Sequence, residues 1–150
     1  MDIKLLVMDV DGTLTDGKIY MSDKGELMKA FNIKDGYGIA LLKEKGVVPA
    51  IITGRSSTIL ENRCNELGIT ELHQGVEDKV KKLYIVCEKY HITPKQVAYI
   101  GDDLNDLDCM RVCRYTAAPA DAVEEVRKSV DFVCKHNGGE GAVREFIDQL

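Results

Sequence analysis

Short apolar segments that end in polar clusters recur three times along the chain. Residues 4–8 lead into Asp-x-Asp-Gly-Thr, residues 47–52 into Thr-Gly-Arg, and residues 97–100 into Gly-Asp-Asp. An unbroken apolar run of this length is typical of a strand that is buried on both faces of a parallel sheet. We therefore predict three parallel strands, each of which ends at a group of polar side chains.

Helical patterns separate these strands. Apolar positions recur at helical spacing in residues 36–45, 57–67 and 76–90. The second pattern opens with Ser/Thr capping candidates and closes at Gly68, while Pro94 marks a restart after the third. This alternation predicts an α/β fold, a doubly wound parallel sheet with helices on both faces. Ligands bind such sheets at the carboxyl ends of the strands, where all three polar clusters fall.

One stretch, residues 14–31, departs from this alternation. It contains two strand-like runs, residues 18–21 and 26–31, on either side of a turn that includes Gly25. This pattern predicts a β-hairpin flap. No internal repeat, low-complexity tract or linker divides the sequence, so we expect a single domain over residues 1–150 that carries the flap.

Composition narrows the classes of partner. The 150 residues carry a net charge of −5 with a pI near 5.2, which leaves no basic surplus for nucleic acid or an anionic membrane. The apolar runs are short and no signal-peptide pattern is visible, so we expect a cytoplasmic protein. The five cysteines form no Cys-x-x-Cys pair, and we expect them to be reduced packing residues.

The first polar cluster contains two carboxylates, Asp9 and Asp11. Residues two apart in an extended segment share a face, so these side chains concentrate negative charge at one point. A hard cation such as Mg²⁺, which prefers oxygen ligands and substrate phosphate, would offset that charge. For an isolated Asp-Gly-Thr the alternative is a turn in which Asp11 caps backbone amides.

The cluster after the third strand, Gly-Asp-Asp-Leu-Asn-Asp, adds three carboxylates and an amide. Asp102 comes first after the strand and is the candidate metal ligand. Asp103, Asn105 and Asp106 could bind metal-bound water or orient Lys79. The alternative for Asp103 or Asn105 is a helix cap without further function.

Thr53, Gly54 and Lys79 are weak signals when each is taken alone. Thr53 offers a hydroxyl and Gly54 an accessible backbone amide, which are the groups needed to hold phosphate oxygens. Lys79 stands at the start of a predicted helix, where a lysine is more often a solvated surface residue. Their position in the ordered series of motifs supports a role in phosphate binding.

That order, Asp-x-Asp-Gly-Thr, Thr-Gly, Lys and Gly-Asp-Asp-x-x-Asp, resembles the four motifs of the haloacid dehalogenase phosphatases over nearly the whole chain. The resemblance implies that Asp9 attacks phosphorus to form an aspartyl phosphate, and that Asp11 protonates the leaving alkoxide and then activates water. It implies that Thr53 and Lys79 hold the phosphoryl oxygens. It also implies a Mg²⁺ ion bound by Asp9, the backbone carbonyl of Asp11 and Asp102.

The spacing of the motifs leaves no room for a cap domain. Between Asp9 and Thr53 the chain has length only for the hairpin, one helix and one strand. The hairpin, residues 31–38, Arg55 and the Gly-rich residues 138–145 are similar to a capless subgroup of this family. Its members act on sugar-acid phosphates such as 3-deoxy-D-manno-octulosonate 8-phosphate (KDO 8-phosphate), in lipopolysaccharide sugar biosynthesis.

Membership of that subgroup implies a homotetramer formed through the hairpin, in which neighbouring subunits help to close each site. The glycine-rich segment, residues 138–141, would lie over a site as well. The guanidinium group of an arginine can form two parallel hydrogen bonds with the carboxylate of a sugar acid. The resemblance assigns substrate contacts to Asn32, Ile33, Lys34, Asp35, Gly36, Gly54, Arg55, Arg63 and Asn105.

Other functions stay open. Ala40 stands where we expect the octulosonate enzymes to carry a basic residue, which leaves a nine-carbon sugar-acid 9-phosphate as an alternative substrate. Arg55 argues against it, because we expect an acidic residue there in the nine-carbon enzyme. A non-catalytic oligomerisation module would share the fold. A receiver domain would carry its phospho-acceptor on a later strand, whereas here Asp-x-Asp ends the first.

Overall fold

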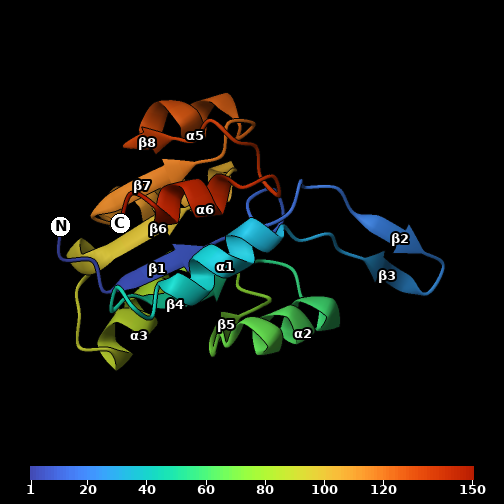
Figure 1. Cartoon of the computed structure of the whole chain (residues 1–150), viewed down its shortest axis with the longest axis horizontal. Coiled ribbons are helices and arrows are strands. Elements are labelled where there is room, and N and C mark those ends of the chain that lie inside the picture. Colours follow the sequence, from blue (N-terminus) through green and yellow to red (C-terminus); the bar gives the residue numbers. More distant parts are fainter.

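The structure, a computed structural model, describes residues 1–150 and is built on a six-stranded parallel sheet (Figure 1). The strand order is β5-β4-β1-β6-β7-β8. In the centre, Met8 of β1 lies opposite Ile51 of β4 and Ile100 of β6. The strands are β1 (Leu5–Met8), β4 (Val48–Ile52), β5 (Glu71–His73), β6 (Val97–Ile100), β7 (Tyr115–Ala118) and β8 (Phe132–Val133).

The three predicted strands are thus the central ones, and the predicted doubly wound fold is confirmed. Apolar side chains on both faces explain the position of β1: Leu6 and Met8 belong to one buried cluster, Leu5 and Val7 to the other. Burial of apolar surface on two faces stabilises a central strand more than an edge strand. The carboxyl ends of β4, β1 and β6 consequently lie side by side.

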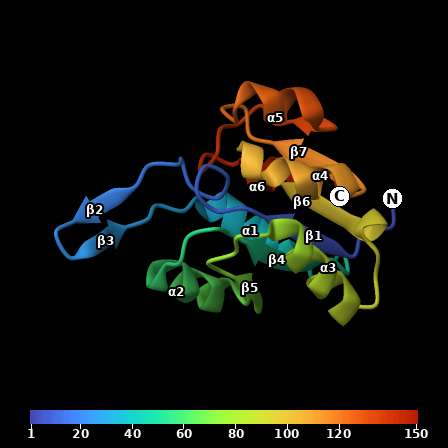
Figure 2. The same ribbon diagram turned by 180° about the vertical axis from the view of Figure 1, so that it is seen from behind.

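Helices cover both faces of the sheet (Figures 1 and 2). One apolar cluster joins the sheet to α1, α2 and α6, and the other joins it to α3, α4 and α5. The helices are α1 (Ile33–Leu41), α2 (Thr58–Leu67), α3 (Lys79–Lys89), α4 (Leu107–Val112), α5 (Glu124–Ser129) and α6 (Ala142–Ile147), with 3₁₀ turns η1 (Pro94–Gln96) and η2 (Leu104–Asp106).

Capping residues set the helix boundaries. The Ser57 hydroxyl accepts a hydrogen bond from the backbone amide of Leu60 at the start of α2. Gly68 ends this helix in the left-handed conformation, as predicted. The other two predicted boundaries are wrong. The Asn32 side chain caps α1, which therefore begins and ends earlier than predicted, and Asp78 caps α3, which begins three residues later.

The hairpin consists of β2 (Tyr20–Ser22) and β3 (Gly25–Met28), which pair antiparallel and extend away from the sheet (Figure 1). Gly25 adopts a φ of 112°, a conformation that favours glycine at this turn. The strands are shorter than predicted but lie inside the expected flap. Apolar side chains stay exposed on the hairpin and beside it: Ile19, Met21, Leu27 and Met28.

Two further features concern the cysteines and the length of the helices. All five cysteines are buried and none forms a disulfide, so they pack as reduced thiols. None of the helices combines the length and the apolar character needed to cross a membrane.

Candidate active site

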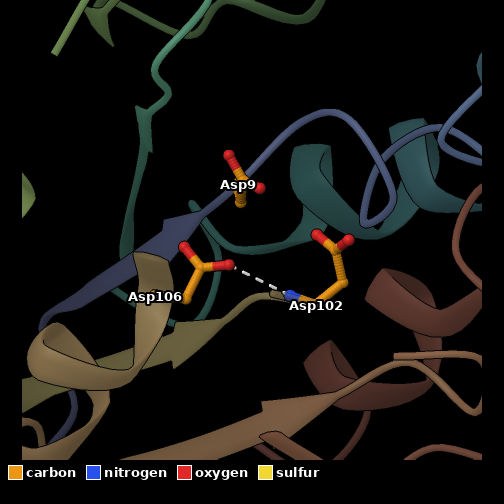
Figure 3. Close-up of side chains that lie close together, drawn as sticks. All are labelled: Asp9, Asp102 and Asp106. Carbon is orange, nitrogen blue, oxygen red and sulfur yellow. Dashed lines mark hydrogen bonds between the residues drawn. The ribbon is translucent and has the colours of Figure 1, made fainter. Parts of the chain in front are cut away.

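Three carboxylates converge where β1 and β6 end (Figure 3). Asp9 follows β1, Asp102 follows β6, and Asp106 ends the short turn η2. Oxygen atoms of the three side chains lie within 4.8 Å of one another. The parallel register of β1 and β6 therefore produces the acidic cluster that the two separate sequence motifs predicted.

Both oxygens of Asp106 are occupied by donors from the protein. Its Oδ2 accepts the backbone amides of Asp102 at 3.1 Å and Asp103 at 3.3 Å, and the first of these bonds is drawn in Figure 3. Its Oδ1 accepts the Tyr99 hydroxyl at 2.7 Å and the Lys79 ammonium at 2.9 Å. Of the roles left open for Asp106, the contacts support the orientation of Lys79.

Lys79 is buried, so the interpretation as a solvated surface lysine is wrong. Only 4% of its side chain is exposed, and Nζ lies 3.1 Å from Oδ1 of Asp9. Burial lowers the pKa of Lys79, but the charges of Asp9 and Asp106 outweigh this effect and raise it. Lys79 therefore presents a permanent positive charge beside Asp9.

The donors around Asp9 and Asp102 fit a hard divalent cation. Burial and the charge of Asp9 raise the pKa of Asp102 to about 8, and burial and the charge of Asp106 raise that of Asp9. A cation would remove this repulsion, and carboxylate oxygens are the ligands that Mg²⁺ prefers. The Thr13 hydroxyl donates to Oδ1 of Asp102 at 2.9 Å and fixes its rotation. The residues thus fit Mg²⁺.

Asp11 does not join this cluster, although it is only two residues from Asp9. Its Oδ1 accepts Nζ of Lys29 at 2.7 Å, and its Oδ2 lies 3.5 Å from Nη1 of Arg55. Each oxygen of Asp11 thus faces a cationic side chain. The two acids consequently have separate surroundings, one beside a metal site and the other beside the hairpin.

An open pocket of about 160 Å³ lies over these acids. No apolar residue lines it, and every residue that lines it is one that the sequence singled out. The lining residues are Asp9, Asp11, Thr53, Gly54, Arg55, Asp103 and Asn105.

The other predicted substrate residues do not line this pocket within one chain. Asn32, Asp35, Gly36 and Arg63 line a separate, mostly apolar cavity under α1 and α2, while Ile33 and Lys34 are exposed on α1.

Asp35 has surroundings of its own in that second cavity. Its Oδ1 accepts the backbone amide of Arg144 at 2.9 Å, which ties α1 to α6. Its Oδ2 is buried without a partner, and burial raises the pKa of Asp35 to about 6. This carboxylate joins α1 to α6 within a single chain and does not line the polar pocket.

The Gly-rich segment packs against the loop that follows Asp9. A Cβ on Gly138 would lie 1.9 Å from the carbonyl oxygen of Gly12, and the amide of Gly139 donates to the carbonyl of Thr13 at 3.1 Å. Two backbones can approach this closely only where a side chain is absent. These two glycines thus pack against the loop that carries Asp11, and neither lines the pocket of its own chain.

Sequence reasoning missed four residues that contact the site: Thr13, Glu26, Lys29 and Tyr99. Thr13 belongs to the first motif, and its place in that motif was the only available signal. Glu26 and Lys29 carry no local pattern, because their contacts with Arg55 and Asp11 join segments far apart in the chain. Tyr99 lies inside the apolar run of β6, where nothing marks its hydroxyl as part of a site.

Comparison with known proteins agrees with this geometry. Residues 70–147 match the haloacid dehalogenase-like hydrolase family. The 3-deoxy-D-manno-octulosonate 8-phosphate phosphatase KdsC of Escherichia coli K12 is 46% identical over 149 residues, which span 99% of this chain and 79% of the relative. The chain therefore belongs to the haloacid dehalogenase-like hydrolases.

Solved structures of octulosonate phosphatases share the fold. That from Yersinia pestis is 46% identical, with a TM-score of 0.95 over 98% of this chain and 80% of its own. The one from Moraxella catarrhalis, solved with magnesium, phosphate and KDO, is 42% identical, with a TM-score of 0.94 over 99% of this chain and 85% of its own.

Proposed function

We propose that the protein is a Mg²⁺-dependent phosphatase that converts KDO 8-phosphate to KDO and inorganic phosphate. The observation that carries this proposal is the arrangement of Asp9 between the Lys79 ammonium and Asp102, at the floor of a polar pocket that also contains Asp11. The KdsC relatives and the solved complex with magnesium, phosphate and KDO support the same reaction.

In the first step a carboxylate oxygen of Asp9 attacks phosphorus, and the bond from phosphorus to the sugar oxygen breaks. Asp11 gives its proton to the departing alkoxide. Lys79 counters the charge that develops on the phosphoryl oxygens, and Thr53 supplies a hydroxyl to them. The products of this step are free KDO and an aspartyl phosphate on Asp9.

In the second step Asp11, now ionised, takes a proton from water, and the water oxygen attacks phosphorus. The bond to Asp9 breaks, which releases phosphate and regenerates the carboxylate. Lys29 and Arg55 lie beside the two oxygens of Asp11. Asp11 therefore alternates between acid and base beside two cations, while Asp9 alone carries the phosphoryl group.

Mg²⁺, held by the carboxylates of Asp9 and Asp102 and the backbone carbonyl of Asp11, would supply charge neutralisation between the nucleophile and the phosphate. The chain's own contribution is to fix the ligands. Thr13 holds Asp102 by a hydrogen bond, and Gly12 leaves room for it, since a Cβ there would lie 2.0 Å from Oδ2 of Asp102.

The exposed hairpin supports a homotetramer, because its apolar side chains have no partner within one chain. In such an assembly a neighbour would present Ile33 and Lys34, the predicted substrate residues that are exposed on α1, whereas Asp35 and Gly36 stay buried in their own chain. Arg55, which lines the pocket, would bind the sugar carboxylate. Light scattering tests this point: a tetramer is expected, and a monomer at assay concentration would contradict it.

Ala40 favours one alternative substrate, a nine-carbon sugar-acid 9-phosphate. The side chain of Ala40 is exposed on α1 and supplies no charge for an eight-carbon sugar acid. Comparison of kcat/KM on KDO 8-phosphate, the nine-carbon phosphate and hexose 6-phosphates, with and without EDTA, separates the candidates. We expect a Mg²⁺-dependent preference for KDO 8-phosphate, and a preference for hexose phosphates would contradict the sugar-acid assignment.

A further inference from the structure

A partly buried ion network connects the hairpin to the pocket. Lys29 contacts Oδ1 of Asp11 at 2.7 Å and Glu26 at 3.1 Å, while Arg55 lies 3.3 Å from Glu26 and 3.5 Å from Oδ2 of Asp11. Glu26 also accepts the hydroxyl of Ser57 at 2.5 Å. Two anions and two cations thus alternate, so every charge in the network faces an opposite one.

Burial distinguishes this network from surface ion pairs. The side chain of Lys29 is only 4% exposed and that of Glu26 is 15% exposed, although both lie on or beside a hairpin that is otherwise largely exposed. Burial raises the pKa of Glu26, but hydrogen bonds from Ser57 and Lys29 outweigh it and lower the pKa. Charge pairs that are shielded from water interact more strongly than exposed pairs.

The geometry assigns different tasks to the two oxygens of Asp11. Oδ1 is held by a short charge-assisted hydrogen bond from Lys29. Oδ2 faces Arg55, whose side chain is 42% exposed and lines the pocket. A carboxylate that is fixed at one oxygen presents the other in a constant direction, which proton transfer to a leaving group requires.

We propose that Lys29 is a positioning residue that holds Oδ1 of Asp11, so that Oδ2 points into the pocket for proton transfer, and that Glu26 keeps Lys29 and Arg55 in place. This inference rests on the proposed phosphatase function and deepens it. The hairpin thereby becomes part of the acid/base apparatus of its own subunit, in addition to any role in assembly.

The dependence of kcat/KM on the leaving group of the substrate tests the proposal. This constant covers all steps up to the first irreversible one, which include the transfer of the phosphoryl group and of the proton to the leaving group. 2,4-Dinitrophenolate leaves without a proton, whereas phenolate and the sugar alkoxide need one from Asp11. We expect K29M to lower kcat/KM on phenyl phosphate and KDO 8-phosphate by roughly 10²-fold, the usual contribution of acid–base catalysis. On 2,4-dinitrophenyl phosphate the loss should stay within about threefold.

Two variants serve as controls. K29R keeps a cation beside Asp11 and should recover most of the loss on phenyl phosphate. K24M removes the same charge from the exposed turn of the same hairpin and should match the wild type on all substrates. Light scattering on each variant separates positioning from assembly. A K29M protein with wild-type oligomeric state and equal losses on both aryl phosphates would overturn the proposal.

The aryl phosphates also separate this inference from the proposed function. Activity on them but not on KDO 8-phosphate would overturn only the substrate assignment, and the comparison of Lys29 variants would still decide the positioning role. A wild-type enzyme without Mg²⁺-dependent activity on either aryl phosphate would overturn both proposals together. Full activity of K29M on phenyl phosphate would overturn the positioning role alone.

Discussion

Replacement of Lys79 by methionine separates the structural cost of the buried charges from their catalytic use. Nζ of Lys79 lies 3.1 Å from Asp9 and 2.9 Å from Asp106, and the side chain of Asp106 is fully buried. Removal of one partner from a buried ion pair costs roughly 3–5 kcal/mol, because the other charge stays desolvated. We expect K79M to lose this amount of unfolding free energy in urea with EDTA present.

The double variant K79M/D106N tests the origin of that loss. The side-chain amide introduced by D106N is uncharged, and its oxygen can still accept the backbone amides that Asp106 holds. The double variant should therefore regain roughly 2 kcal/mol relative to K79M, a coupling typical of residues in one network. Catalysis should not return, since loss of one charge-stabilising donor lowers kcat by roughly 10²–10³-fold.

The control for this experiment is K81M, which removes an exposed lysine from the same helix. Its stability should stay within about 0.5 kcal/mol of the wild type, and its activity should not change. The reasoning would be refuted if K79M were as stable as K81M in EDTA. It would also be refuted if the double variant recovered phosphate release from KDO 8-phosphate.

Three further predictions concern pH, packing and metal. Burial raises the pKa of Asp35 from 3.8 to about 6, so its ionisation costs the folded state roughly 3 kcal/mol at higher pH. The stability of the wild type relative to D35N should therefore fall as pH rises from 4 to above 6 in urea unfolding; a constant difference would contradict this. G138A should lose about 1–3 kcal/mol, because its Cβ would meet the carbonyl of Gly12, and an unchanged midpoint would contradict the contact. EDTA should abolish activity, and added Mg²⁺ should raise Tm more at pH 8.5 than at pH 6.5, because the metal must displace a proton from Asp102, whose pKa burial and Asp9 raise to about 8. Equal Tm shifts at the two pH values would contradict that proton release.

The sequence predicted the centre of the sheet because burial on both faces leaves a continuous apolar run. It did not reveal the two edge strands, β5 and β8. Residues 71–73 of β5 include Glu71 and His73, and β8 has only two residues, so neither carries such a run. The last three helices have six residues each, which is too short for a helical period to stand out.

Three of the four sequence motifs were predictable because each follows a strand whose end the sequence marks, whereas Lys79 opens a helix after β5, which carries no such run. The surroundings of those residues were not. The ion pair between Lys29 and Asp11 joins the end of a hairpin to the end of a strand. Lys79 pairs with Asp106 from another segment, and Tyr99 donates a hydrogen bond to the same carboxylate. Such contacts depend on tertiary packing, which local spacing does not encode.

Phosphate release from KDO 8-phosphate by the wild type and by D9N, each with Mg²⁺ and with EDTA, tests the proposed function most directly. The substitution keeps the size of Asp9 but replaces the nucleophilic carboxylate by an amide. We expect release only from the wild type with Mg²⁺, and none above the enzyme-free rate from D9N. Full activity of D9N, or release that is unchanged by EDTA, would contradict the proposed mechanism.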